Sequence, residues 1–393
     1  MNGHVIWGFG DDVNYGIGDF EAVDGQRDFN GDGVPDILAI ADGNEEGTGY
    51  HRAYLFNGVN GNMIWQYIYP GPSLAFGKTI ISVDDVTGDG VPDAVIDVGN
   101  NGTTDLDVIC LNGTNGQVKW TFPVTGYEPK ELLELPIPGQ TSDVVASQYF
   151  GKIYRIDGET GAQVWAYDYG FTGVIQISRI RDVNGDNIDD ILVAALSGSV
   201  ICLSGSNGQV IWNYPMNYQY GVAAVPDLNN DGVDDMITGD QDGTFYCISG
   251  TGSPLFFSHT FGGDRIVTVN ALPSIDGNAS YELLGGTKNG KVVCFSGGLN
   301  AVPVELISFN ASLNGVNVTL TWTTASQLNN RGFEIERKSG NGDYQSISFI
   351  KGDGTTTEQK SYSYTDKELQ EGDYTYRLKQ IDFDSSVHYS GAR

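Results

Sequence analysis

Four short acidic loops hold the residues of this chain whose types and spacing could do chemistry. Each loop has oxygen-bearing side chains at its first, third and fifth positions and an aspartate at its ninth, and the backbone carbonyl of the seventh position completes the set. Oxygen ligands in a flexible loop suit Ca²⁺, whereas Mg²⁺ needs a stricter octahedron and keeps its waters. The pattern therefore predicts about four calcium sites. The expected ligands are Asp28, Asn30, Asp32, Val34 and Asp36; Asp85, Thr87, Asp89, Val91 and Asp93; Asp182, Asn184, Asp186, Ile188 and Asp190; and Asp227, Asn229, Asp231, Val233 and Asp235.

These calcium sites are expected to be structural. Extracellular calcium modules bind at roughly 10⁻⁴ to 10⁻³ M, close to the free ion level outside cells, so their sites are mostly filled and stiffen their turns. Pro35 and Pro92 restrict two of the loops further. A sensor would need an affinity matched to a changing signal, and nothing in the sequence indicates one.

No residues with catalytic spacing accompany the loops. The histidines His4, His51, His259 and His388 are scattered, and the sequence has no HExxH or GxSxG motif and no Cys/His cluster with zinc spacing. Neighbouring carboxylates could serve a glycosidase or lyase, but a pair among 50 acidic residues is a weak indication. We therefore predict no catalytic residues.

The net charge of −29 limits the partners that this chain could bind. Nucleic acid and anionic membrane surfaces need a basic face, so neither is expected as a partner. No run of 18 apolar residues occurs, and membrane insertion is not predicted. Residues 2–9 favour a strand rather than a signal peptide, so a secreted form would have lost its leader.

A second repeat, a glycine turn followed by an apolar strand that carries tryptophan, alternates with the acidic loops. Its copies end at Trp65, Trp120, Trp165 and Trp212. A degenerate copy, TGSPLFF, covers 251–257. Together with Trp7, the tryptophans recur at about 45 to 58 residues, the length of one four-stranded propeller blade. No stretch has helical apolar spacing, so the sequence predicts an all-β propeller over residues 1–298.

The strand count favours six blades, with a lost seventh blade as the alternative. Residues 2–7 resemble the outermost strand of a blade that has no other strands, and the last repeat ends after its third strand near residue 297. Pairing of these two segments would close the ring and remove two exposed sheet edges. In the third blade LPIPGQTSD replaces the acidic loop. In the sixth blade only a remnant is left, formed by Ser274, Asp276, Asn278 and Glu282.

The four cysteines, Cys110, Cys202, Cys247 and Cys294, occupy one and the same position of the repeat. Equivalent positions of different blades lie further apart than the roughly 7 Å between Cα atoms that a disulfide allows. We therefore expect four buried thiols without disulfides.

The loops and the tryptophan strands carry two resemblances that together cover residues 1–298. The DxNxDGxxD loops resemble the FG-GAP or VCBS repeats of integrin-α-type propellers. The GxxxW strands resemble the repeats of quinoprotein propellers, a resemblance that implies a PQQ site with a vicinal disulfide and a catalytic aspartate. The sequence has no adjacent cysteine pair, so we interpret the tryptophans as anchors between blades.

The pattern changes after a short linker at 299–303. Residues 304–393 contain seven alternating strands, the size of an immunoglobulin-like or fibronectin type III sandwich, with Trp322 as the core indole and Tyr374 or Tyr376 as the tyrosine corner. The stretch closely resembles the sandwich module that precedes the sorting domain of type IX secretion substrates. This resemblance implies export to the cell surface or the medium, with a sorting domain expected after residue 393.

The four strands of a propeller blade are named a to d in chain order, and the acidic loops are expected between a and b. The connections from d to the next a and from b to c share the opposite face, which is the candidate binding face. Its tyrosines are Tyr67, Tyr69, Tyr127, Tyr218 and Tyr220. Exposed tyrosines suit sugar or protein recognition, and packing between blades is the alternative. We interpret the chain as a secreted or cell-surface, non-catalytic binding or adhesion protein that recognises polysaccharide or a surface protein. The alternatives are a structural subunit of an extracellular filament or surface layer, self-associating by strand exchange, and a polysaccharide-active enzyme.

Overall fold

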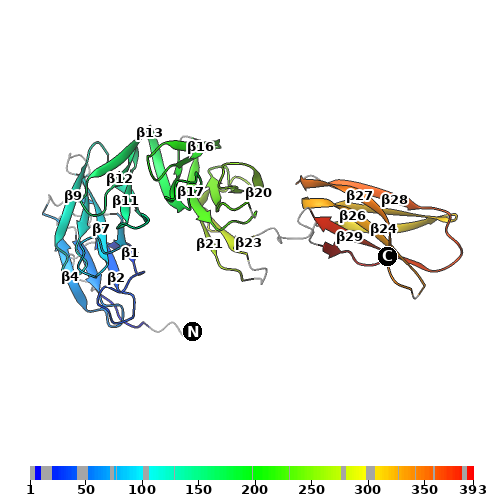
Figure 1. Ribbon diagram of the computed structural model, residues 1–393, viewed down its shortest axis with the longest axis horizontal. Helices are drawn as coiled ribbons and strands as arrows, with labels where there is room; N and C mark the ends of the chain where they lie inside the picture. Colours follow the sequence, from blue (N-terminus) through cyan, green and yellow to red (C-terminus); the bar gives the residue numbers. More distant parts are fainter. Residues whose placement is uncertain are drawn as a thin grey trace. The chain divides into compact units, whose positions relative to one another are not determined.

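The computed structural model is built from β-strands, and no helix occurs among the residues it describes (Figure 1). The structure describes residues 5–9, 20–41, 52–70, 75–76, 78–100, 106–127, 129–196, 198–229, 231–275, 280–297, 306–325, 327–340, 342–356, 359–382 and 387–393. The chain divides into two compact units, one of residues 1–271 and 283–294 and the other of residues 272–282 and 295–393. Within the described residues no helix is long and apolar enough to cross a membrane. The predicted linker 299–303 lies outside the described residues.

Antiparallel sheets whose strands follow one another in chain order make up residues 20–295. The first sheet contains β1 (Phe20–Asp24), β2 (Ile37–Ala41), β3 (Arg52–Phe56) and β4 (Met63–Ile68). The second contains β5 (Ala75–Phe76), β6 (Ile80–Val83), β7 (Asp93–Asn100), β8 (Leu106–Leu111) and β9 (Val118–Val124). The third contains β10 (Pro129–Leu135), β11 (Asp143–Gln148), β12 (Phe150–Ile156) and the first part of β13 (Gln163–Ile180).

The long strand β13 belongs to two sheets, since its first part pairs with β12 and its second part with β14. The fourth sheet therefore contains the second part of β13, β14 (Asp190–Ala195), β15 (Ser199–Leu203) and β16 (Val210–Pro215). The fifth contains β17 (Gln219–Val225), β18 (Asp235–Asp240), β19 (Thr244–Ile248) and β20 (Leu255–Thr260). The sixth has three described strands, β21 (Ile266–Leu272), β22 (Glu282–Thr287) and β23 (Val292–Phe295).

Four hydrophobic clusters lie between neighbouring sheets, and a further one on the first sheet packs against Trp7. Leu55 and Trp65 of the first sheet pack in one cluster with Ile96 and Ile109 of the second. Similar clusters join the second sheet to the third, the third to the fourth and the fourth to the fifth. The middle strands of each sheet are covered on both faces, which is why segments such as β14 read as continuous apolar runs.

The predicted pairing of the N-terminal strand with the sixth sheet is not found among the described residues. Residues 1–4 lie outside the described part of the chain, and residues 5–9 form no strand. The ring of Trp7 nevertheless lies against the first sheet, 6.2 Å from the ring of Phe56.

All four cysteines are free, as predicted, but the prediction that all four are buried is wrong. Cys110, Cys202 and Cys247 are buried, and each lies opposite Trp120, Trp212 or Phe257 of the outermost strand. Cys294 is exposed. It lies on β23, where the sixth sheet has no fourth described strand to cover it.

Residues 306–389 form two sheets that share one core. The first contains β24 (Leu306–Asn314), β25 (Asn317–Thr324) and β28 (Lys360–Asp366). The second contains β26 (Gln327–Ser339), β27 (Gln345–Thr356), β29 (Tyr374–Asp382) and β30 (Val387–Tyr389). Trp322 is 1% exposed and packs with Phe333 and Tyr376, as expected for a core indole. Of the two tyrosine-corner candidates, Tyr374 donates its hydroxyl to the backbone oxygen of Gln370 at 3.1 Å, whereas Tyr376 donates to Asp366.

Candidate metal-binding loops

The four acidic loops connect β1 to β2, β6 to β7, β13 to β14 and β17 to β18 in the first, second, fourth and fifth sheets. In each loop the first aspartate accepts hydrogen bonds from the loop's own backbone. The oxygens of Asp28 accept the N–H groups of Gly31 and Gly33, both at 2.7 Å. The equivalent bonds to Gly88 and Gly90 are 2.6 and 2.7 Å. These bonds fold the loop around its acidic side chains.

The sixth position needs a left-handed backbone, because the chain turns sharply there. Gly33, Gly90 and Gly232 have φ angles of 86°, 86° and 90°. The third loop has Asn187 at this position with φ 66°, and asparagine tolerates the left-handed region better than most residues. Its N–H still donates to Asp182 at 2.7 Å, so this loop keeps the geometry of the others.

The third, fifth and seventh positions form short turns with each other. Asn30, Asn184 and Asn229 each accept the N–H of the fifth-position aspartate with their side-chain oxygen. Thr87 instead donates its hydroxyl to Asp93 at 3.2 Å. The fifth-position aspartates accept, in turn, the N–H groups of Val34, Val91, Ile188 and Val233 at 2.9, 3.0, 3.0 and 2.9 Å.

The ninth-position aspartate is buried and connects its loop to the turn between the last two strands of the same sheet. Asp36 accepts the N–H of Phe29 and of Gly58, both at 2.9 Å. Asp93, Asp190 and Asp235 repeat this bridge to Gly113, Gly205 and Gly250 at 2.8, 3.0 and 3.3 Å. The acidic loops and the glycine turns therefore lie at the same end of each of these four sheets.

A second contact between loop and turn reaches the fifth position. Asn57 donates to Asp32 at 2.9 Å, and Asn112 donates to Asp89 at 2.7 Å. In the fourth and fifth sheets serine hydroxyls replace the amide, with Ser206 and Ser249 donating to Asp186 and Asp231 at 2.7 and 2.9 Å.

The carboxylates of one loop differ in their electrostatic surroundings. The N–H of Gly33, with other backbone N–H groups, holds the pKa of Asp28 below its usual value. Burial raises the pKa of Asp190 to about 6 and that of Asp235 to about 7, although backbone N–H groups oppose the shift. The negative charges of Asp227 and Asp231 add to the shift of Asp235. This repulsion within a loop is what a bound divalent cation would relieve.

The residue types fit calcium, since every side chain offered is an oxygen donor from Asp, Asn or Thr. Within the described residues, however, no group of three or more His, Cys, Asp or Glu side chains is arranged to hold a metal ion. The third-position side chains are amides or a hydroxyl, and several loop oxygens already accept N–H groups. To bind an ion, these side chains would therefore have to leave their present hydrogen bonds and move closer together.

The third sheet has no acidic loop but keeps the buried carboxylate. Asp143, the last residue of LPIPGQTSD, accepts the N–H of Gly158 at 3.0 Å and the side chain of Arg155 at 2.6 Å. Glu282 serves the sixth sheet in the same way, accepting the N–H groups of Ile275 and Gly297 at 2.8 and 3.2 Å. Asp276 and Asn278 of the predicted remnant lie outside the described residues. Aligning the nine positions of all six segments could have identified this sixfold bridge.

Each repeat tryptophan is an anchor between neighbouring sheets, as predicted. Trp65 donates its indole N–H to the backbone oxygen of Gly113 in the next sheet at 2.7 Å. Its ring covers Gly116, where an added Cβ would lie 2.9 Å from ring atoms. Trp120, Trp165 and Trp212 donate in the same way to Gly158, Gly205 and Gly250 at 2.7, 2.8 and 2.8 Å.

The predicted ligand-binding tyrosines differ in exposure. Tyr67 and Tyr69 are half-buried against the core between the first two sheets, and Tyr69 donates to Asp107 at 3.0 Å. Tyr127 and Tyr218 are 40% and 47% exposed. Tyr220 is partly buried, with the guanidinium of Arg265 4.2 Å from its ring centre. Only Tyr127 and Tyr218 of this set therefore offer much surface to a ligand.

Successive antiparallel sheets with cores between them define a β-propeller-like protein. Residues 3–251 and 108–324 match the family model described as outer membrane protein assembly factor BamB, and the chain belongs to this family. The predicted relation to PQQ-type repeats is thereby confirmed at the level of a propeller family. No curated protein matches the chain.

Two solved structures with TM-scores above 0.5 share the propeller-like fold at low sequence identity. Sqt1 of Saccharomyces cerevisiae is 12% identical with a TM-score of 0.52, covering 67% of this chain and 69% of its own. BBS1N, in its complex with ARL6DN, is 12% identical with a TM-score of 0.51, covering 70% and 78%. BamB from Moraxella catarrhalis is 16% identical and covers 90% of both chains, with a TM-score of 0.42.

Proposed function

We propose that this protein is a calcium-stiffened β-propeller that binds polysaccharide or a surface protein outside the cell without catalysing a reaction. The observation that carries the proposal is the repetition of one loop geometry in four sheets, each loop tied to its own sheet by a buried aspartate. Catalysis needs one distinct centre, whereas equal sites in successive repeats suit a structural ion. The FG-GAP or VCBS identity of the loops is part of this proposal.

The exposed tyrosines support recognition at the end of the sheets opposite the loops. The ring of Tyr127 makes an edge contact with Phe150, 5.2 Å between ring centres, which orders the exposed ring. Beside Tyr218, Asn217 and Asp242 supply polar groups. Rigid aromatic surface with nearby hydrogen-bonding groups suits the apolar face and hydroxyls of a sugar, and also suits a protein partner.

The closed six-bladed ring is a further part of the proposal. Trp7 donates its indole N–H to Gly58 at 3.0 Å, and its ring covers Gly61, where an added Cβ would lie 2.6 Å away. Every other repeat tryptophan makes these contacts from the outermost strand of the preceding sheet. Trp7 therefore occupies the place that the outermost strand of the last sheet would reach. If the pairing followed the registers of Cys110 with Trp120 and of Cys202 with Trp212, Cys294 would lie opposite Trp7.

The second candidate is a subunit of an extracellular filament. It is favoured by the exposed apolar residues of the N-terminal segment and of β23, the two segments that would pair. Val5 and Ile6 are 73% and 82% exposed, and Val292 on β23 is 82% exposed. If the N-terminal segment completed the sixth sheet of a neighbouring copy, the chain would polymerise by strand exchange.

The module at 306–393 is proposed to be the fibronectin-III-like domain typical of type IX secretion substrates. Its seven described strands in two sheets and its buried Trp322 support this assignment. Export by that route would place the protein at the cell surface or in the medium, where free calcium is abundant.

The test is binding of the full chain to a panel of glycans in millimolar Ca²⁺, repeated with Tyr127→Ser and Tyr218→Ser. We expect saturable binding that one or both substitutions weaken. Tyr389→Ser, at a tyrosine 54% exposed in the other unit, is the matched control and should bind like the wild type. Absence of binding across the panel would refute sugar recognition, and equal binding by all three variants would refute the proposed face.

A further inference from the structure

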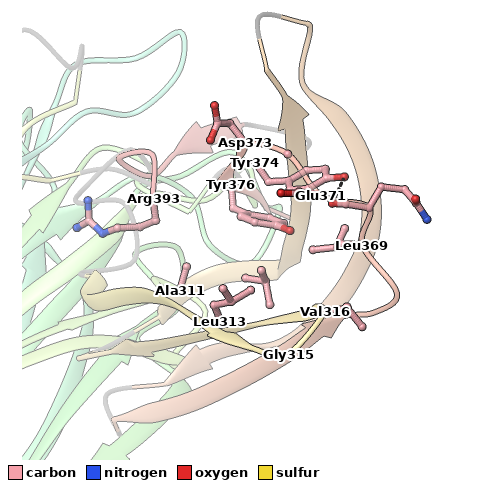
Figure 2. Close-up of a pocket in the computed structure, with 13 residues that line it drawn as sticks. Ala311, Leu313, Gly315, Val316, Leu369, Glu371, Asp373, Tyr374, Tyr376 and Arg393 are labelled. Atoms are coloured by element: carbon pink, nitrogen blue, oxygen red, sulfur yellow. Dashed lines mark hydrogen bonds between the residues drawn. The ribbon is translucent and has the colours of Figure 1, made fainter.

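A pocket of about 540 Å³ opens at one end of the two sheets at 306–393. Figure 2 shows it between the tip of the β24–β25 hairpin and the segment that leads from β28 to β29. The buried Tyr376 lies at its floor, and Leu313, Val316 and Leu369 line its walls (Figure 2). A cavity of this volume is large enough for a ligand or for one or two large side chains of a partner.

The walls of this pocket are held in place by hydrogen bonds. Leu369 donates its N–H to the carbonyl of Val316 at 2.9 Å, which joins the two walls at their base. The hydroxyl of Tyr376, at the floor, donates to Asp366 at 2.9 Å, and Asp366 forms an ion pair with Arg337 at 3.0 Å. These bonds tie both the hairpin side and the β28–β29 side of the pocket to the rest of the fold.

Its apolar walls are unusually exposed. Leu313 is 77% exposed and Val316 is 60% exposed, and both line the pocket. Exposed apolar side chains that line a concave site are typical of places where a partner binds, because association removes their surface from water.

The rim carries charges of both signs. Glu371 and Asp373 are exposed on the segment between β28 and β29, and Figure 2 shows Asp373 towards Arg393 and Glu371 on the far side of the pocket. The Nε of Arg393 donates to the carbonyl of Phe309 at 2.8 Å. A ligand with a cation next to an apolar group would meet the two carboxylates with its charge while its apolar part entered the pocket. Arg393 would repel a second cation and so set the direction of the ligand.

We propose that this pocket binds a polypeptide segment in which a large apolar side chain is followed or preceded by lysine or arginine. A second copy of this chain is a poor occupant, because the net charge of −29 makes two copies repel each other. The site is independent of the propeller's acidic loops and of its tyrosines. It would give the module at 306–393 a partner of its own.

The test uses the full chain and three fluorescent decapeptide pools, read by anisotropy. One pool has a central leucine or phenylalanine flanked by lysine and arginine, one has the same centre flanked by glutamate and aspartate, and one has a central serine flanked by lysine and arginine. We expect saturable binding of the first pool only, weakening as salt is raised because rim charges are screened. Binding of the acidic pool or of the serine pool as tight as that of the first would overturn the proposal, and so would binding of none of them at low salt.

Two variants locate the binding. Leu313→Ser/Val316→Ser changes side chains that are already exposed, so the fold should persist, and binding of the first pool should weaken roughly tenfold. Glu371→Gln/Asp373→Asn should weaken it roughly fivefold at low salt and remove most of its salt dependence. Ile307→Ser, at an exposed position outside the pocket, is the control and should bind like the wild type. Unchanged binding by the first variant, or a dimer in light scattering that this variant abolishes, would overturn the assignment.

Discussion

Two carboxyl groups outside the acidic loops, the buried Asp97 and the partly buried Glu131, are chemically distinct at the residue scale. Burial raises the pKa of Asp97, on β7, and that of Glu131, on β10, to about 7 each. Asp97 accepts the N–H groups of Lys78 and Thr79 at 2.8 and 2.7 Å, bonds that partly compensate its burial. Neither residue belongs to the predicted calcium ligands, so their titration reports on the fold.

Asp97 leads to a pH-dependent prediction. Its folded pKa lies above the value near 4 of an unfolded aspartate, so the folded state holds the proton more tightly. Its contribution to stability is therefore full below about pH 4 and is lost as the pH rises towards 7. Asp97→Asn stays neutral and keeps an oxygen for both N–H groups. Its free energy of unfolding should exceed that of the wild type at pH 8 by on the order of 3 kcal/mol.

The measurement is urea unfolding of both proteins at several pH values, taking the difference at each so that the many other acidic groups cancel. The difference should shrink towards zero near pH 4. Equal stability of the two proteins at pH 8 would show that Asp97 is not held as a buried carboxyl group.

At the element scale, the strands are joined by two recurring devices, the tryptophan anchor between sheets and the carboxylate bridge within a sheet. The anchor explains why glycine is needed at the turn positions that tryptophan rings cover, since Gly161 would place a Cβ 2.7 Å from the ring of Trp120. The bridge explains why Asp143 is present in a loop that has lost all the other acidic residues of the repeat.

We predict that Trp120→Phe destabilises the first unit by about 1–3 kcal/mol. The ring volume is largely kept, but the carbonyl of Gly158 loses the indole N–H that now donates to it at 2.7 Å in a buried site. Urea unfolding monitored by circular dichroism measures the effect. Val118→Ala, at an exposed position of the same strand, is the control and should change stability by less than about 0.5 kcal/mol.

Calcium removal is the second prediction at this scale. If the loops hold structural ions, chelation should lower the melting temperature by about 5 °C or more, because ions bound only by the folded state stabilise it by mass action. Differential scanning calorimetry with EDTA, with EDTA and excess Ca²⁺, and with Mg²⁺ alone distinguishes calcium from general salt effects. A melting temperature that chelation leaves unchanged contradicts the calcium proposal.

At the scale of the whole molecule, the decisive question is what completes the sixth sheet. The segment that carries Trp7 lies near the N-terminal end, and a sheet with three described strands and an exposed thiol at Cys294 lies near the end of the repeats. Closure within one chain produces a monomer, whereas exchange between chains produces a polymer. The same strand edges are paired in the monomer and in the polymer, so only a measurement on the whole molecule distinguishes the two forms.

We predict that the closed form protects Cys294 from a thiol reagent. In the native monomer all four thiols should then react slowly, because Cys110, Cys202 and Cys247 are already buried. Deleting residues 1–9 should make one thiol react quickly, and mass spectrometry should identify it as Cys294. Fast labelling of Cys294 in the intact monomer would contradict closure, and protection found only in polymers would establish strand exchange.

The sequence alone determined the local features of this protein, namely its all-β class, the repeat period, the positions of the loops and turns and the anchoring role of the tryptophans. These follow from short-range patterns of glycine, acidic and apolar residues, which constrain the backbone within a few residues. Only the tertiary structure decided that Cys294 is exposed while its three equivalents are buried, and that Tyr67 and Tyr69 pack against a core. Burial depends on which strands lie beside a residue in space, and neighbours from distant segments leave no mark on local spacing.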